Sequence, residues 1–232
     1  QRYFWSQKLN KKKYHLITSA NELTWKFDRP VIFLGEWCCL DKRKHIWKNM
    51  DAIVAKPYGI ENWKKDSDFV EIKNLENKLF PKICNLLNNS HQTKYSERFW
   101  WIVLGHWFEI FVRLIFKNVN TINNCLELNE ISGTTICHNE NYKLLTLNYA
   151  AFNQAIYDVK WNSFLFSRIL TLQKFKNLNL EIIKEKNTTI EKEFFEIKKQ
   201  KKHRSIREKI FKLSYKGYKY LANKFVRNND AF

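Results

Sequence analysis

Short apolar runs alternate with segments of helical periodicity along most of the chain. Val31 to Leu34 form a continuous apolar run, which is typical of a strand buried on both faces. Similar runs predict strands over 14–18, 31–35, 52–55 and 133–137, and a weaker fifth strand over 178–183. Because a helical segment separates the second and third of these strands, the pair forms a βαβ unit and is predicted to be parallel.

Apolar residues at helical spacing predict the remaining elements. These helices cover residues 41–49, 61–89 with an interruption near Pro81, 96–128, 148–158 and 160–174. Strands that alternate with helices favour an α/β fold. We therefore predict a Rossmann-like parallel sheet with helices on both faces, in which the first four strands are neighbours.

The longest predicted helix contains a segment, 99–116, that is apolar for 18 residues and has the length of a membrane span. His106, Glu109, Arg113 and Lys117 interrupt it at steps of three and four residues, which places them on one helical face. Charges in the middle of a span would be costly in lipid. We therefore interpret the segment as a long buried helix of a soluble domain, with Glu109 and Arg113 paired.

Composition divides the chain near residue 188. Hydrophobic residues make up 44% of the sequence, which is enough for a core and excludes disorder over most of the chain. The formal net charge of +18 arises mainly at the two ends, because residues 14–183 hold 21 basic and 17 acidic residues. We predict a Rossmann-like N-terminal domain over 1–187 and a basic helical extension, or a linker to a second domain, over 188–232. The Gln at position 1 indicates a piece of a longer protein.

The lysine-rich segment 198–227 interleaves apolar residues with its cations. A basic amphipathic helix of this kind is typical of binding to an anionic membrane surface or to nucleic acid. The alternative is a solvated helix that packs on a partner domain outside this chain. A non-catalytic module that binds a membrane or nucleic acid is therefore the rival to an enzyme, and nucleic acid is the less favoured partner.

Several familiar kinds of site are absent from the sequence. The five cysteines have no CxxC spacing and are predicted to be free thiols in a reducing compartment, without a metal site. The five glycines lie too far apart for a GxGxxG loop or a P-loop. No GxSxG motif occurs, which argues against a hydrolase of that type. We therefore expect no cofactor in this chain.

The residues after the strand over 31–35 carry the strongest candidate chemistry. Open α/β sheets bind ligands at the carboxyl ends of their strands. Glu36 stands at such an end and is a candidate general base, with His45 as a second candidate catalytic residue. Trp37 could stack on a sugar ring, and Arg43 with His45 could bind a phosphate or a sugar acid. We expect Glu36, Trp37 and His45 to line one concavity.

Each of these residues also has a structural interpretation. Glu36 could pair with Arg43 or cap the following helix. Arg43 and His45 could belong to a solvated first helical turn. The three tryptophans between residues 100 and 107 recur at helical spacing and are better explained as core residues than as ligand platforms.

A series of sequence blocks follows in a familiar order: TSANELTW (18–25), RPVIFLGEWC (29–38), RKHIW (43–47), YSERFWWIVLGHWF (95–108) and NEIS (129–132). Together they resemble the N-terminal half of a family of transferases from bacterial O-antigen and surface-polysaccharide gene clusters. The similarity covers about residues 14–170, and the tail after about residue 188 has no counterpart in it. The GEWC and RKHIW blocks, followed by RFWW and LGHW, are the specific part.

The resemblance implies a glycosyltransferase-like enzyme of O-antigen or surface-polysaccharide biosynthesis, of which this chain is the acceptor-side half and is inactive alone. It implies a sugar or a lipid-linked glycan as acceptor, and a cytoplasmic location at the periphery of the inner membrane, where the surface is anionic. The nucleotide-sugar donor is expected in the second half, because no glycine-rich phosphate loop occurs here. Arg98 and His106 are candidate substrate-binding residues of the later block, although His106 could instead be a satisfied buried histidine.

Overall fold

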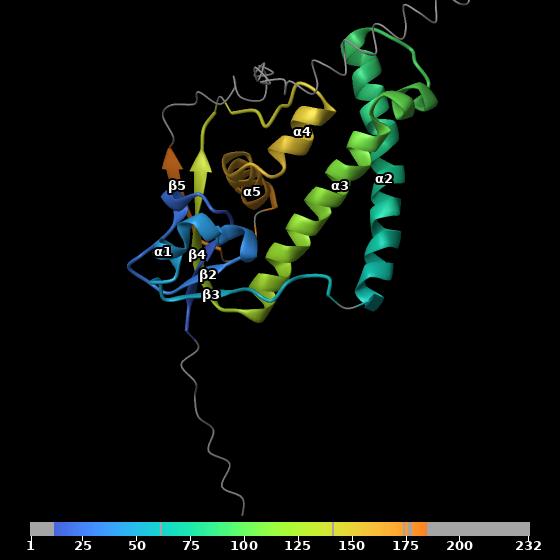
Figure 1. The fold of residues 1–232 in the computed structure, drawn as a ribbon. Helices are drawn as coiled ribbons and strands as arrows, with labels where there is room; N and C mark the ends of the chain where they lie inside the picture. The colour runs from blue at the N-terminus through green and yellow to red at the C-terminus, as the bar shows by residue number, and fades with distance from the viewer. Residues whose placement is uncertain (1–11, 61, 141, 174, 176–177, 185–232) are drawn as a thin grey trace, which may run out of the picture. The chain divides into compact units, whose positions relative to one another are not determined.

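The computed structural model describes residues 12–60, 62–140, 142–173, 175 and 178–184 (Figure 1). The predicted domain boundary near residue 188 and the basic extension after it lie outside these residues.

A five-stranded parallel sheet forms the centre of the described domain, in the order β3-β2-β1-β4-β5. The strands are β1 (Tyr14–Ile17), β2 (Val31–Phe33), β3 (Ala52–Val54), β4 (Ile131–His138) and β5 (Leu180–Lys184). The predicted Rossmann-like α/β fold is confirmed, and so is the parallel pairing of the predicted strands. The chain runs outward from β1 to β3 and then crosses to β4 on the other side of β1. The strand order therefore reverses between β1 and β4, which is where open α/β sheets form a ligand crevice.

Helices supply the rest of the regular structure: α1 (Lys44–Trp47), α2 (Asn62–His91), α3 (Glu97–Leu128), α4 (Tyr149–Ala155) and α5 (Val159–Gln173), with the short 3₁₀ segments η1 (Glu22–Thr24), η2 (Glu36–Cys38) and η3 (Asp41–Arg43).

The predicted interruption near Pro81 is wrong, because α2 continues through the proline. Phe80 and Cys84, on either side of it, are buried in a cluster with Trp100 and Phe108 of α3. This packing offsets the backbone hydrogen bond that a proline cannot donate.

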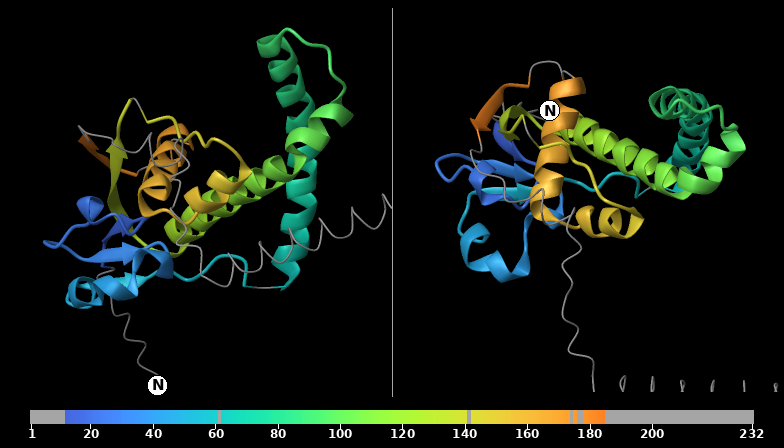
Figure 2. Two further views of the ribbon diagram at one scale, coloured as in Figure 1. Left: turned by 45° about the horizontal axis from the view of Figure 1, so that its top comes forward. Right: turned by 90° about the horizontal axis from the view of Figure 1, so that it is seen from above.

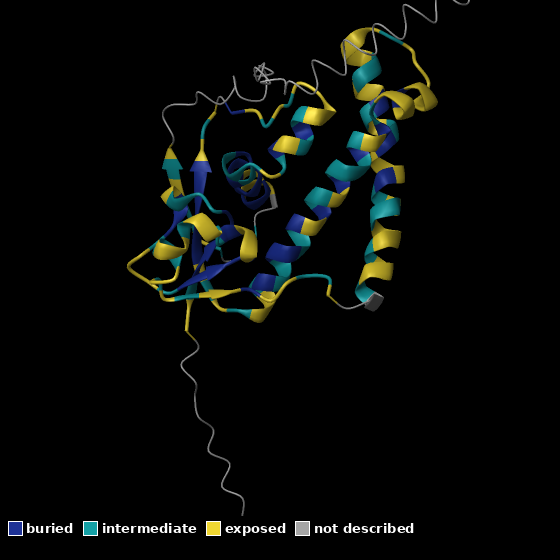
Figure 3. Ribbon diagram, viewed as in Figure 1, coloured by how far each residue is buried: buried dark blue, intermediate teal, exposed yellow. Residues whose placement is uncertain are grey.

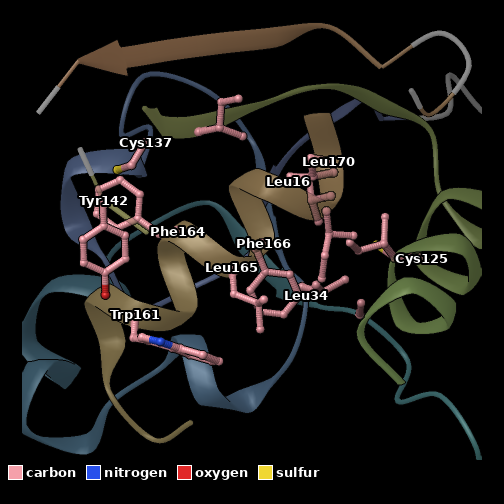
Figure 4. Packing of buried hydrophobic residues seen from close by; sticks show 14 of the residues in the cluster. Leu16, Leu34, Cys125, Cys137, Tyr142, Trp161, Phe164, Leu165, Phe166 and Leu170 are labelled. Atoms are coloured by element: carbon pink, nitrogen blue, oxygen red, sulfur yellow. The ribbon is translucent and has the colours of Figure 1, made fainter. Parts of the chain in front are cut away.

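Alternate residues of a strand point to opposite faces of the sheet, and both faces are covered by other parts of the chain (Figures 2 and 3). On one face, Leu16 and Ile32 belong to the main core, together with side chains of α3 and α5 (Figure 4). On the other face, Ile17 and Phe33 pack with Trp25 and with partly buried residues of α1. All three residues of β2 are buried, which explains the uninterrupted apolar run in its sequence.

Charged residues join α2 to α3. The predicted contact between Glu109 and Arg113 is present, with Arg113 Nη2 3.7 Å from Glu109 Oε1. Lys73 of α2 extends the cluster, because its Nζ lies 2.6 Å from Glu76 Oε2 and 3.0 Å from Glu109 Oε1. The Glu76 side chain is only 3% exposed, and Lys73 and Arg113 balance its charge. The polar stripe of α3 therefore serves in part to attach this helix to α2.

Among the described residues, α3 is the one helix that is long and apolar enough to cross a membrane, judged by length and composition. Its carboxyl half lies in the core, but Ile102 and Val103 in its amino half are 76% and 60% exposed. The expectation of a helix buried along its length is therefore wrong for this half. Packing of α2 there buries Trp100 and Phe108, on a different side of α3.

His15 is a buried ionisable residue within the sheet. Its Nε2 lies 2.9 Å from Thr135 Oγ1 on the neighbouring strand β4, and the residue is 1% exposed. Burial lowers the pKa of His15 below its ordinary value of 6.5, because the charged imidazolium is poorly solvated there. Between the two pKa values the unfolded chain therefore binds more protons than the folded chain.

We expect the free energy of unfolding to fall as the pH drops below 6.5 toward the lowered pKa of His15. Above pH 6.5, where both states hold a neutral imidazole, this contribution is fully present. Urea unfolding at about pH 7.5 and about pH 5.5 measures the difference, and the His15→Gln variant serves as the comparison because Gln can still bond Thr135. An equal loss of stability in both proteins would mean that other groups cause it.

Candidate functional site

Polar groups gather at the carboxyl edge of the sheet, where the strand order reverses between β1 and β4. The loop after β1 carries Asn21, whose Nδ2 donates to Cys137 Sγ of β4 at 3.3 Å and to Ser163 Oγ of α5 at 3.2 Å. Its Oδ1 accepts a hydrogen bond from the backbone N–H of Leu23 at 3.2 Å and thereby caps η1. The Asn21 side chain thus connects the ends of β1, β4 and α5.

Sequence reasoning missed Asn21. Its side-chain partners lie 116 and 142 residues away, so no local pattern could reveal them. The available signal was its place in the TSANELTW block, directly after the first strand.

Trp37 is held in place at the carboxyl end of β2. Its Nε1 donates to the Thr18 carbonyl at 3.0 Å, and its ring is parallel to Phe166 with centroids 6.4 Å apart. The ring also covers Gly35, because a Cβ at Gly35 would lie only 2.0 Å from Cζ3 of Trp37. The residue is nevertheless 43% exposed, so part of the ring is accessible to a ligand.

Glu36 begins η2, two residues beyond the end of β2, and is exposed. Within the part of the chain that the structure describes, no hydrogen bond or ion pair engages its carboxylate. The two structural interpretations of Glu36 both fail. Arg43 does not pair with it, and the N-cap positions of η2 and η3 are Gly35 and Leu40.

Arg43 instead forms a bidentate ion pair with Glu22 in the loop after β1. Its Nη2 donates to Oε2 at 2.6 Å, and its Nε donates to Oε1. These hydrogen bonds from Arg43 hold the pKa of Glu22 below its ordinary value, and the nearby His45 adds to the effect. Because Trp37 is bonded to the same loop, the structure brings Trp37, Arg43 and His45 to one end of the sheet.

Arg98 and His106 lie on α3, apart from the strand ends. Arg98 is exposed in the first turn of the helix, and His106 follows two turns later. The ring of His106 is exposed, and its Nε2 lies 2.9 Å from the Tyr149 hydroxyl of α4. The alternative of a buried histidine is therefore wrong, although this ring does have a partner.

A cavity of about 310 Å³ lies between α3, α4 and the segment that follows β4. It is lined by Val103, Leu104, Trp107, Phe111, Leu144, Leu145, Thr146, Asn148, Tyr149, Phe152 and Trp161. Tyr149 belongs to this lining, and His106, its hydrogen-bond partner, does not. None of Glu36, Trp37 and His45 lines this cavity, and the concavity expected around them stays a prediction.

The described cysteines are poorly suited to nucleophilic chemistry. Burial raises the pKa of the Cys38 thiol far above its ordinary value and raises that of Cys125 to about 11. No group of three or more His, Cys, Asp or Glu side chains that could hold a metal ion occurs within the described ranges. The sequence-predicted residues near the sheet edge offer a carboxylate, an indole, a guanidinium and an imidazole.

Comparison with known proteins identifies a family for this chain. A family model described as LIC12162 family transferase matches residues 14–231. The match continues through the tail, so the expectation that the tail after about residue 188 has no counterpart in the family is wrong. No curated protein and no solved structure matches the chain.

Proposed function

The chain belongs to the LIC12162 family of transferases, and we propose that it transfers a sugar to a glycan acceptor in the biosynthesis of a bacterial surface polysaccharide such as an O-antigen. The observation that carries the proposal is the exposed carboxylate of Glu36, which has no partner among the described residues and adjoins an anchored indole near the carboxyl end of a parallel strand. That position is where this class of sheet places its ligands.

Glu36 is the proposed general base. In an inverting transfer, an acceptor hydroxyl attacks the anomeric carbon of the donor sugar and must lose its proton. The new bond joins the acceptor oxygen to that carbon, and the bond to the leaving phosphate breaks with its electron pair. The proton passes to the Glu36 carboxylate, which is exposed and has no competing partner among the described residues.

Trp37 is the proposed platform for the acceptor sugar. An indole presents a flat apolar face to the C–H groups of a sugar ring, and the hydrogen bond to Thr18 fixes the angle of this one. Arg43 and His45 are the proposed cationic groups beside it. Since Glu22 already engages the guanidinium of Arg43, His45 is the freer of the two for an anionic substituent on the substrate.

The donor is proposed to be a nucleotide sugar that binds outside this chain. Release of a nucleoside diphosphate from a panel of nucleotide sugars, with and without a glycolipid extract, tests the function on the full-length protein. The proposal requires that release by one donor depends on the extract. Extract-independent release would indicate a hydrolase, and no release with any donor would contradict a sugar transferase.

The acceptor is proposed to be lipid-linked, with the protein at the cytoplasmic surface of the inner membrane. Residues 198–227 combine many cations with apolar residues, and each Lys or Arg near an anionic surface contributes about 1 kcal/mol. We expect the full-length protein to co-sediment with vesicles that contain an anionic lipid at low salt, and to be released at high salt because ions screen the attraction. Equal binding at both salt concentrations, or none at either, would contradict this mode of attachment.

A further inference from the structure

An exposed apolar patch covers part of the amino half of α3 and of the segment after β4. Its members, each 38–76% exposed, are Tyr95, Phe99, Ile102, Val103 and Leu145, and we call them the α3 patch. Tyr95 stacks on Phe99 with ring centroids 4.0 Å apart. Phe99, Ile102 and Val103 share one face of the helix, because they lie three and four residues apart. Val103 and Leu145 line the same cavity, so the patch is continuous across the two segments.

Three exposed cations border the α3 patch in sequence: Lys94, Arg98 and Lys143. Within the part of the chain that the structure describes, none of them forms an ion pair. Arg98 lies one helical turn before Ile102 and therefore on the same side of α3. Glu97 is the only acidic residue between 92 and 108, and it lies on a different side of the helix, five residues from Ile102. Residues 142–149 include no acidic residue, so the border of the patch is positively charged.

This charge restricts what can cover the α3 patch. A second copy of the chain in a two-fold contact would bring like charges together, which is unfavourable. The segment 198–227 is rich in Lys and Arg and would be repelled for the same reason. A nucleic acid would meet Ile102 and Val103, which offer it neither a hydrogen bond nor a stacking surface. An anionic lipid surface satisfies both properties, because it takes up apolar side chains and attracts the cations beside them.

We infer that the α3 patch inserts into the interfacial layer of a bilayer that contains anionic lipid. Its aliphatic side chains enter the boundary of the acyl chains, Tyr95 lies at the level of the headgroups, and the long side chain of Arg98 extends back to the phosphates. The helix lies on the membrane and does not span it, because its carboxyl half is part of the protein core. The inference extends the proposed membrane attachment and rests on it in one respect, since both place the protein at a bilayer. It depends neither on residues 198–227 nor on the group transferred.

Insertion is measured with an environment-sensitive nitrobenzoxadiazole label on single cysteines of the full-length protein. Cys39→Ser removes the one cysteine that is not buried, and Ile102→Cys then supplies the labelling site in the patch. Leu172→Cys is the matched control, because Leu172 of α5 is 78% exposed and Ile102 is 76% exposed. Vesicles of phosphatidylglycerol and phosphatidylcholine should raise the fluorescence at position 102 about twofold or more, and lipids with brominated acyl chains should quench it. The label at position 172 should respond to neither.

Unlabelled variants of the full-length protein separate the apolar from the electrostatic part of binding. Ile102→Asp should weaken partitioning into these vesicles about tenfold or more, because an inserted apolar side chain is replaced by a charge that the lipid repels. Leu172→Asp makes a comparable change outside the patch and should alter partitioning less than about twofold. Arg98→Gln should weaken binding to the anionic vesicles about fivefold and leave binding to neutral vesicles within about twofold of the original. Melting temperatures show whether each variant keeps its fold.

The assignment to a membrane surface is overturned if the label at position 102 does not respond to vesicles, if both labels respond alike, or if Ile102→Asp and Leu172→Asp have equal effects. A rise in fluorescence at position 102 with protein concentration, without vesicles, would identify a second copy as the occupant and also overturn it. Co-sedimentation with vesicles without a response at position 102 would contradict insertion of the patch and leave attachment through residues 198–227 in place. A Glu36→Gln variant should keep the response even where it abolishes transfer, so failure of the patch and failure of the proposed function give different results.

Discussion

Replacement of Glu36 by Gln is expected to lower kcat for sugar transfer about 100-fold or more, because a positioned general base typically contributes at least that factor. Gln has nearly the same shape as Glu but cannot accept the proton of the acceptor hydroxyl. Glu36 is exposed and makes no contact that the described fold depends on, so the stability of the variant should be unchanged. Initial rates with saturating donor and acceptor measure the effect, and KM for the acceptor should change little.

Asp41→Asn is the matched control for this change. Asp41 is another exposed carboxylate, at the start of η3 and five residues after Glu36 in the sequence. Its loss should leave kcat within about twofold of the original, as expected for a surface substitution. A reduction of less than about tenfold in Glu36→Gln, or an equal reduction in Asp41→Asn, would leave Glu36 without a role as base.

Substitution of Ala for Gly35 is expected to displace the Trp37 ring. The added Cβ would lie 2.0 Å from Cζ3 of Trp37, far inside contact distance, and the exposed ring can move more easily than the buried backbone. The displaced ring would lose its hydrogen bond to Thr18 and its stacking on Phe166. The sum of these contacts predicts a loss of about 1 to 3 kcal/mol in urea unfolding, together with a higher KM for the acceptor.

A double-mutant cycle shows whether the effect passes through Trp37. In a Trp37→Ala background there is no ring to displace, so Gly35→Ala should change the free energy of unfolding by less than about 0.5 kcal/mol. Additive losses in the double variant would mean that Gly35 is required for another reason. The steric account of this pair would then be wrong.

The sheet could be predicted from the sequence because each strand is marked by an apolar run of neighbouring residues. The run from Val31 to Leu34 and the shorter run near residue 53 each mark one strand, and the helical segment between them dictates a parallel pair. The long helix α3 was equally visible, including its contact between Glu109 and Arg113 four residues apart. The prediction at Pro81 was wrong because packing of Phe80 against α3 offsets the backbone hydrogen bond that the proline cannot donate. The sequence around Pro81 does not show that packing.

The candidate site could be predicted only in part, because its geometry depends on distant residues. The strand-end rule pointed to Glu36 and Trp37, which follow the end of β2 after Leu34 and Gly35. The partner of Arg43, however, is Glu22 at a separation of 21 residues, and the anchor of Trp37 is a backbone carbonyl 19 residues away. The cavity beside Tyr149 combines three separate segments, so no stretch of sequence contains its pattern.

The most direct test of a sugar transferase is the mass of the product that it makes. Mass spectrometry of the lipid fraction, after incubation of the full-length protein with nucleotide sugars and the membranes of its source, identifies the transferred group. We expect the original protein to produce a glycolipid that gains the mass of one glycosyl residue, and Glu36→Gln to produce about 100-fold less of it. A product that gains an acyl, phosphoryl or methyl group instead, or equal product from both proteins, would contradict it.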